Sequence, residues 1–354
     1  MNTEYIEKEF KKRFSDTDRR IVVARSGVLC PLMGFYNIPG SRVMTCMLSM
    51  SSYTALRKFQ SDIVRVQKLS ENICIVNSLK NRPNRLETAW AENSLSVFFN
   101  SSPMLDSGLD ALMHSDTEPS DRTADRASAM AALAKLYDLN LTRDDAAAIC
   151  GGGKESITPY RLSFAHKPGY GTAIINTDCV RFPLPMQNYK LVLVRDVQKN
   201  KTNQIPLILE GLENIREIFP NIISFEDISS DEFERMKHFI KKRRSANYIS
   251  HIIYENERIA AAVTALKGFN YEQLFTIINQ SQRSAQLFWD IPYEIADLSD
   301  LVLKLDGVVC SHFEENGIYF IVKSDFTDNA INNIRHYYKQ KAGQMPTFYI
   351  NSIL

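Results

Sequence analysis

The feature that most constrains the fold is a run of apolar residues at helical spacing in the second half of the chain. With one polar residue among them, the residues that follow helical spacing along one face are Ile249, Ile252, Ile253, Asn256, Ile259, Ala260, Val263 and Leu266. Gly268 follows, and glycine is common just beyond the end of a helix. An apolar stripe of this kind faces a protein core. The pattern predicts a long helix that is buried along one face.

Short apolar runs typical of strands alternate with further helical patterns. The expected strands are 21–24, 62–70, 73–76, 171–176, 190–195, 317–322 and 346–350. The expected helices are 4–14, 127–137, 329–341 and one that Thr142 caps and Gly151 to Gly153 end. Segment 101–125 is polar and rich in turn residues, which predicts a loop or a mobile segment. The fold class is therefore mixed α/β (α+β).

The chain is long enough for two domains. Its 354 residues exceed the roughly 150 residues of an ordinary domain. Asn200, Lys201, Thr202 and Asn203 have the composition of a linker. We therefore predict an N-terminal α/β domain over 1–198 and a C-terminal α/β domain over 199–354.

Charge and cysteine usage exclude several classes of partner. The 42 basic and 41 acidic residues nearly cancel, so we expect neither nucleic acid nor membrane as a partner. The N-terminus is charged from its fourth residue and lacks the apolar core of a signal peptide, which favours a cytoplasmic protein. The six cysteines are scattered without a zinc-type spacing and are interpreted as reduced core thiols.

Three local patterns resemble functional motifs but have simpler interpretations. Residues 151–154, GGGK, lack the upstream glycine of a phosphate-binding loop and follow a helix, so we interpret them as a helix cap. His251 and Glu255 have metal-ligand spacing without a third ligand, so we expect a helix-surface hydrogen bond or a domain contact and no metal site. The basic run 241–244 is interpreted as a solvated face.

Segment 251–302 carries a more specific signal. It reads HIIYENERIAAAVTALKGFNYEQLFTIINQSQRSAQLFWDIPYEIADLSDLV and resembles the galactokinase family, with matching residues at Glu255, Asn256, Arg258, Ser281, Ser284, Pro292, Glu294, Asp297 and Leu298. Residues 338–349, YKQKAGQMPTFY, also resemble the C-terminal family pattern. The resemblance implies the two-domain GHMP-kinase fold, with the ligand cleft between the domains.

The resemblance also identifies positions where this chain departs from the family. The family motif APGRVNLIGEHTDYNGG aligns onto residues 25–41, where Val28 stands in place of an arginine that supports phosphoryl transfer. Gly34 and Phe35 replace a glutamate and a histidine, and Asn37 replaces a sugar-binding aspartate. An amide still bonds a sugar hydroxyl, although it carries no charge.

The other two motifs and the catalytic base are altered too. The glycine-rich nucleotide loop aligns with 116–123, where Asp116, Glu118 and Asp121 would repel phosphates, or alternatively with 106–109. In 157–163, Pro159 stands at the position of the catalytic aspartate. The third motif is replaced near 311–317.

The function implied is that of a galactokinase-like protein with degenerate ATP and catalytic motifs, a non-catalytic sugar-binding or regulatory pseudokinase. Asn37 and Tyr160 are the predicted sugar contacts; no catalytic residue and no metal ligand is predicted, and the nucleotide contacts are unassigned. No cofactor is expected, and the partner is a sugar or other small molecule or a regulatory protein. The alternative is an atypical active galactokinase that transfers the γ-phosphate of ATP, with Mg²⁺, to galactose.

Overall fold

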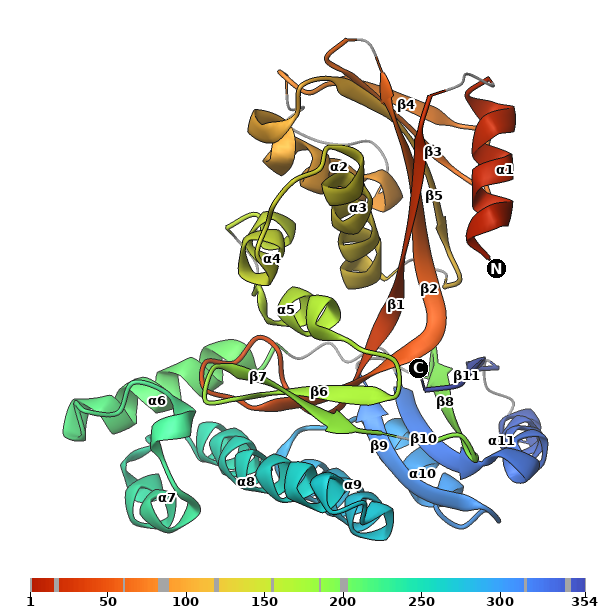
Figure 1. Ribbon diagram of the computed structural model, residues 1–354. Helices are drawn as coiled ribbons and strands as arrows, with labels where there is room; N and C mark the ends of the chain where they lie inside the picture. Colours follow the sequence, from red (N-terminus) through yellow and green to blue (C-terminus); the bar gives the residue numbers. More distant parts are fainter. Residues whose placement is uncertain are drawn as a thin grey trace. The chain divides into compact units, whose positions relative to one another are not determined.

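A computed structural model describes residues 2–15, 19–59, 61–81, 89–117, 121–153, 156–184, 186–197, 203–314, 317–340 and 345–353. The chain forms two compact units (Figure 1). The first comprises residues 1–29 and 47–166, and the second comprises residues 30–46 and 167–354. Strands β1 (Ile21–Gly34) and β2 (Val43–Phe59) therefore each contribute residues to both units.

The first unit is a sheet with helices on both faces. Besides parts of β1 and β2 it contains α1 (Thr3–Arg13), β3 (Ile63–Lys68), β4 (Cys74–Ser78), α2 (Ala89–Ser101), β5 (Gly108–Ser115), α3 (Arg122–Leu136), α4 (Arg143–Gly151) and α5 (Thr158–Ala165). The strand order is β4-β3-β5-β2, with β1 also paired to β2.

Side-chain alternation along β2 explains the two layers of this unit. Tyr53 and Ala55 pack with Ile6 and Phe10 of α1, whereas Leu56 packs with the core formed by α2 and α3. Successive residues of a strand point to opposite faces, so one strand serves both cores. Figure 1 shows α1 on one side of the sheet and α2 and α3 on the other.

The expectation of a loop over 101–125 is wrong for most of that segment. Residues 102–104 form a short 3₁₀ helix, Gly108–Ser115 form β5 in the interior of the sheet, and α3 begins at Arg122. The sequence pattern did not predict this strand, because the charged residue Asp110 interrupts its apolar run. The carboxylate is fully buried and is paired with arginines from both neighbouring strands. Residues 118–120 lie outside the described residues.

The second unit contains a four-stranded sheet, the last two strands of the seven-stranded sheet that begins in the first unit, and most of the helices. Its elements are β6 (Tyr170–Ile175), β7 (Asp178–Pro183), β8 (Tyr189–Arg195), α6 (Ile205–Ile218), α7 (Ser230–Met236), α8 (Arg243–Lys267), α9 (Tyr271–Phe288), α10 (Tyr293–Val302), β9 (Val308–Glu314), β10 (Gly317–Lys323), α11 (Thr327–Gln340) and β11 (Thr347–Asn351). One sheet has the order β11-β8-β10-β9. In the other, β6 pairs with both β7 and residues 43–45 of β2.

The long helix predicted from periodicity is α8. Ile249, Ile252 and Ile253 are fully buried and pack in a core with Ile208, Leu212 and Ile215 of α6. The apolar stripe is therefore covered chiefly by helices, and a separate apolar cluster lies on the four-stranded sheet. Gly268 ends the helix as expected.

The division into units differs from the boundary predicted at 198/199. The predicted linker lies largely in 198–202, outside the described residues. In the structure the chain passes between units after His166, and residues 30–46 belong to the second unit. Strand pairing explains this division, since β6 pairs with residues 43–45 and β8 pairs with β10 and β11.

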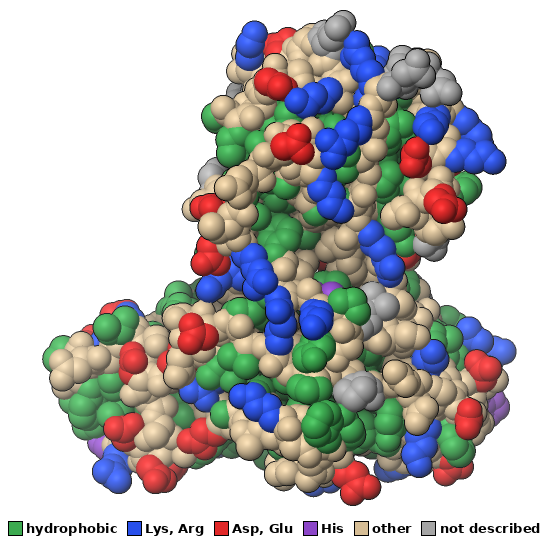
Figure 2. All heavy atoms as spheres, viewed as in Figure 1, with side chains coloured by type: hydrophobic (Ala, Val, Ile, Leu, Met, Phe, Trp, Pro, Cys, Tyr) green, Lys and Arg blue, Asp and Glu red, His purple; other side chains and the backbone are tan. Residues whose placement is uncertain are grey.

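The remaining fold-level expectations concern surface and composition. Acidic and basic side chains are interspersed on the face in Figure 2, as expected from a net charge of +1. None of the described helices combines the length and apolar character that a membrane crossing requires. Cys30, Cys46, Cys150 and Cys310 are buried, but Cys74 is exposed, so the interpretation of all six cysteines as core thiols is wrong for Cys74.

Candidate functional site

The loop that follows β1, residues 35–42, carries the predicted sugar contact Asn37. Asn37 is exposed. On one side of it, the Phe35 ring stacks on Trp289 with 4.2 Å between centroids. On the other side, Ile38 is buried in the helical core of the second unit. The loop therefore presents Asn37 from a backbone that is anchored on both sides.

Helix α8 fixes the far end of the 35–42 loop. The Asn256 amide donates to the Gly40 carbonyl at 2.8 Å, and its Oδ1 accepts from the Arg42 backbone N–H at 2.7 Å. The Arg42 side chain in turn donates to the Asn256 carbonyl at 2.9 Å and to Asn176 at 3.0 Å. Asn256 thus bonds to the loop backbone. This gives a structural role to one of the positions that match the family segment. Arg42 was not singled out from the sequence, because its partners are distant in the chain.

Six polar side chains, all buried except the partly exposed Arg258, form the Glu255 network between α8, α9 and β9: His251, Glu255, Arg258, Ser281, Ser284 and His312. Glu255 accepts from the Ser281 hydroxyl at 2.6 Å and from Arg258 Nε at 2.8 Å. The Ser284 hydroxyl lies 2.9 Å from His251 Nδ1 and accepts from Arg258 at 3.1 Å. Ser281 also lies 2.8 Å from His312 Nε2. The network ties two helices and a strand together.

Burial and charge set the protonation of the Glu255 network. Burial alone would raise the pKa of Glu255, but electrostatic interaction with His251, Arg258 and His312 and the Ser281 hydrogen bond hold that pKa below its ordinary value. Burial lowers the pKa of His251 to about 4 and also lowers the pKa of His312. Both imidazoles are therefore neutral at pH 7, and Arg258 is the cation that balances Glu255.

Of the two alternatives for His251 and Glu255, the helix-surface hydrogen bond is wrong. Both side chains are fully buried and bond to residues of α9. His251 also meets the Phe35 ring edge-on at 5.8 Å, so the network lies directly beneath the 35–42 loop. Within the described part of the chain, no group of three or more His, Cys, Asp or Glu side chains is arranged to hold a metal ion. The arrangement positions the loop, and the network has no exposed acid or base.

Two altered motif positions in β1 are closely packed. Val28 is buried, with 1% of its surface exposed. Gly34 adopts φ +82°, and a Cβ atom placed there would lie 2.0 Å from the Arg42 carbonyl oxygen. A side chain at position 34 therefore cannot fit unless the backbone moves. The glutamate that the family motif carries at this position has no room in this chain.

The candidate nucleotide loop leads into α3 in the first unit. Asp121 is the N-cap of this helix, and its carboxylate accepts from the Ala124 backbone N–H at 2.8 Å. Asp116 accepts from the Ser51 backbone N–H at 2.9 Å and lies 3.2 Å from His114 Nε2. Glu118 lies outside the described residues. The positive end of the α3 dipole already has a carboxylate beside it.

The segment aligned with the catalytic base forms α5. Pro159 lies in the first turn of this helix, a position that tolerates the missing N–H of proline. Tyr160, the second predicted sugar contact, is buried in the core of the first unit and its hydroxyl accepts from Arg126 at 3.2 Å. Arg126 also donates to the Cys150 carbonyl at 2.8 Å. Arg126 was missed from the sequence, because an arginine inside an alanine-rich helix is typical of an exposed face.

The other two patterns have the simpler interpretation. Gly152 and Gly153 adopt positive φ at the end of α4, which confirms the helix cap, and Lys154 lies outside the described residues. The basic run 241–244 is exposed at the start of α8. Asn37 belongs to the second unit and Tyr160 to the first. Their joint role in a sugar site stays a prediction.

Comparison with known proteins shows that this chain is similar to galactokinases. A galactokinase from Clostridium perfringens is 25% identical over 345 residues, which cover 89% of this chain and 88% of the relative. A galactokinase from Fusobacterium nucleatum is 23% identical over 343 residues with the same coverage. The structure of Lactococcus lactis galactokinase complexed with galactose matches with a TM-score of 0.85 at 16% identity, covering 99% of this chain and 97% of that one. The chain is similar to galactokinases over most of its length, at the level of a divergent relative.

The fold agrees with the wider superfamily. Mevalonate kinase from Methanococcus jannaschii matches this chain with a TM-score of 0.65 at 14% identity, over 95% of this chain and 99% of the other. The GHMP-kinase fold that the sequence resemblance implies is thus confirmed. No protein-family model matches the chain.

Proposed function

We propose that this galactokinase-family protein is a pseudokinase, which binds a sugar in a non-catalytic or regulatory role. The observation that carries the proposal is the N-terminus of α3. Amides at such a helix end bind phosphate oxygens in nucleotide-binding folds. Here the Asp121 carboxylate accepts from one of those amides, and Asp116 lies in the preceding loop. A polyphosphate would meet like charge where the family carries a glycine-rich loop.

The altered catalytic positions support the same proposal. Catalysis of phosphoryl transfer rests on positioning of the phosphate and on electrostatic stabilisation of the transition state. Val28 and Pro159 stand at the positions of the family's arginine and aspartate, and neither carries a charge or accepts a proton. We therefore expect neither ATP nor Mg²⁺ as a cofactor.

Sugar binding rests on a separate observation. The galactokinase of Lactococcus lactis, which this chain matches over 99% of its length, is complexed with galactose. Asn37 is exposed on an anchored loop, and an amide both donates to and accepts from sugar hydroxyls. The Tyr160 hydroxyl is the second proposed contact. Galactose is accordingly the first sugar to test.

Titration calorimetry of the purified protein with galactose, ATP and MgATP tests the proposal. We expect galactose to bind and both nucleotides to give no saturable heat. Asn37→Ala should weaken galactose binding about fivefold or more, since one lost hydrogen bond is worth about 1 kcal/mol. Asn221→Ala, an exposed asparagine in the same unit, is the matched control and should leave binding unchanged. Unaltered affinity in Asn37→Ala would remove Asn37 from the site.

The alternative is an atypical galactokinase that uses ATP and Mg²⁺ to phosphorylate galactose. The match to proteins named galactokinase over 89% of this chain favours it. A phosphorylation assay separates the two functions, because the alternative requires saturable MgATP binding and a galactose-dependent phosphorylated product. Turnover in the unmodified protein would overturn the pseudokinase proposal.

A further inference from the structure

Three charged residues form a row across the sheet of the first unit. In the strand register, Asp110 of β5 lies opposite Arg57 of β2 and also opposite Arg65 of β3. The three side chains share one face of the sheet, the face on which α1 packs, because Ala55 and Leu112 two positions away contact α1. The row thus lies on the face opposite to α2 and α3.

The row carries an excess of positive charge. Asp110 is fully buried and accepts from Arg57 at 2.7 Å and from Arg65 at 2.6 and 2.9 Å. One carboxylate therefore serves two guanidinium groups, and a charge of +1 remains. The bidentate bond also fixes the plane of the Arg65 guanidinium, which stacks over the Phe59 ring at 4.2 Å.

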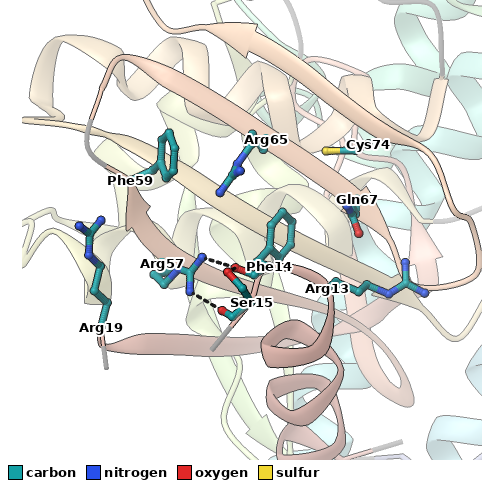
Figure 3. A pocket seen from close by; sticks show the side chains of 9 residues that line it. All are labelled: Arg13, Phe14, Ser15, Arg19, Arg57, Phe59, Arg65, Gln67 and Cys74. Carbon is teal, nitrogen blue, oxygen red and sulfur yellow. Dashed lines mark hydrogen bonds between the residues drawn. The ribbon is translucent and has the colours of Figure 1, made fainter. Parts of the chain in front are cut away.

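A cavity of about 420 Å³ opens over this row where α1 ends. Figure 3 shows its lining, in which Arg57 and Arg65 point into the space beside Phe14 and Phe59. The described residues that line it are Arg13, Phe14, Ser15, Arg19, Arg57, Phe59, Arg65, Gln67 and Cys74, and none of these is acidic. Arg13 and Arg19 donate to backbone carbonyls, which do not neutralise them.

Several donors in the lining are available to a ligand. Arg57 is occupied by the carbonyls of Phe14 and Ser15 and by Asp110. By contrast, Arg65 Nη1 and the Gln67 side-chain amide have no hydrogen-bond partner within the described part of the chain, and Arg19 makes a single 3.4 Å bond. An oriented guanidinium with a free edge is suited to the oxygens of a phosphate group.

We propose that this arginine pocket binds a small phosphorylated molecule, with its phosphate on Arg65 and Arg19. A cavity of this volume is in the range of small-molecule sites, and its aromatic walls suit the carbon part of a metabolite. The pocket lies wholly within the first unit and uses neither Asn37 nor Tyr160. The proposal therefore stands independently of the proposed sugar site.

Titration calorimetry with inorganic phosphate, pyrophosphate and ribose 5-phosphate tests the pocket. We expect all three to bind, ribose 5-phosphate more tightly than inorganic phosphate, with affinity falling several-fold as sodium chloride rises from 50 to 200 mM. Arg19→Gln should weaken binding about fivefold and Arg65→Lys about tenfold, since lysine keeps the charge and loses the fork. Asn37→Ala should have no effect on phosphate binding.

Arg20→Gln is the matched control. Arg20 is the neighbour of Arg19, is exposed, and pairs with Asp138 outside the pocket lining. The Arg20→Gln substitution removes the same charge from the same segment. Equal weakening of phosphate binding in Arg19→Gln and Arg20→Gln would therefore indicate attraction by general surface charge and overturn the proposal. Arg19 is exposed and its loss should not affect folding, which keeps the test valid if Arg65→Lys is unstable.

Cys74 supplies a second readout. It is an exposed thiol in the lining, whereas the other described cysteines lie outside it. Pyrophosphate should slow alkylation of Cys74 by iodoacetamide, measured by mass spectrometry, while alkylation of Cys179 stays unchanged. No protection and no heat with any of the three anions would overturn the proposal. So would binding of a hexaglutamate peptide alone, because that result would assign the pocket to an acidic protein segment.

Discussion

The Glu255 network in the second unit and the altered motifs of the first unit differ in what they retain from the family. In the network, each residue that matches the family has a buried partner, as with Glu255, Ser281 and Arg258. In the first unit, the positions assigned to catalysis hold Val28 and Pro159, which form part of a strand and a helix turn. The network residues bond to other residues of the protein. The family residues that Val28 and Pro159 replace would instead act on a ligand.

The comparison distinguishes residues that stabilise the fold from residues that serve only a ligand. A buried charge that loses its partner destabilises the fold, so Glu255 and Arg258 depend on each other. A residue that serves only a ligand has no such dependence, and its replacement leaves the fold intact. The predictions below test this separation.

The largest effect is expected in the network. Glu255→Ala would leave Arg258 without its carboxylate and Ser281 without an acceptor, at a cost of roughly 3–5 kcal/mol in the free energy of unfolding. Urea denaturation measures this loss. Glu257→Ala, an exposed glutamate on the same helix, should cost about 0.5 kcal/mol. Similar losses in the two variants would show that the network is not a structural core.

A charge introduced into the first unit should also destabilise, without creating a kinase. Val28→Arg places a guanidinium at a buried strand position, and a cost of roughly 3 kcal/mol is expected for an unpaired buried charge. Val76→Arg, at an exposed position of β4, is the control and should be nearly neutral. In combination with Pro159→Asp, Val28→Arg should still give no MgATP-dependent phosphorylation of galactose. A phosphorylated product would mean that the nucleotide is already held in place.

The pH dependence of stability tests the burial of His251. An unfolded histidine takes up a proton near pH 6.5, whereas folded His251 does so only near pH 4. Between these values the unfolded state binds more protons, so stability falls as the pH falls. The His251 contribution to this fall is roughly 3 kcal/mol at full titration. His251→Gln should remove it, and parallel stability curves for the two proteins from pH 7 to pH 4 would contradict the assignment.

The smallest effect concerns the segment that carries the 35–42 loop. The Tyr319 hydroxyl donates to the Leu32 carbonyl at 2.6 Å in a fully buried position. Tyr319→Phe should cost about 1 kcal/mol and increase hydrogen exchange near residue 32. Tyr293→Phe removes an exposed hydroxyl and should change neither measurement. An equal cost in both variants would show that the hydrogen bond does not fix the segment.

The sequence predicted elements whose pattern is local. Helix α8 follows from its apolar stripe, and the cap of α4 follows from Thr142 and the glycines beyond the helix. Strand β5 was not predicted, because Asp110 contradicts an apolar pattern until its two arginine partners are known. Those partners lie 53 and 45 residues away in the chain, where no local pattern finds them.

As with the fold, the sequence predicted residues of the candidate site but not their long-range partners. The resemblance located Asn37, Glu255 and Asn256, but the hydrogen bonds from Asn256 to the 35–42 loop span more than 200 residues. Likewise, the spacing of His251 and Glu255 predicted that the two residues share a helix. It did not predict that their side chains are buried, because burial depends on α9 and β9. The arginine pocket arises from strand register and had no sequence signal.

The contribution of residues 30–46 to the second unit has a consequence for how the protein is made. The hydrogen bond from Tyr319 to Leu32 spans 287 residues, so Leu32 leaves the ribosome long before its partner exists. At a synthesis rate of about 5–20 residues per second, that interval is roughly 15 to 60 s. Until β6 is translated, residues 43–45 also lack the strand with which they pair. The nascent chain is therefore exposed to aggregation at its N-terminal third, and this is where a chaperone would be needed during translation.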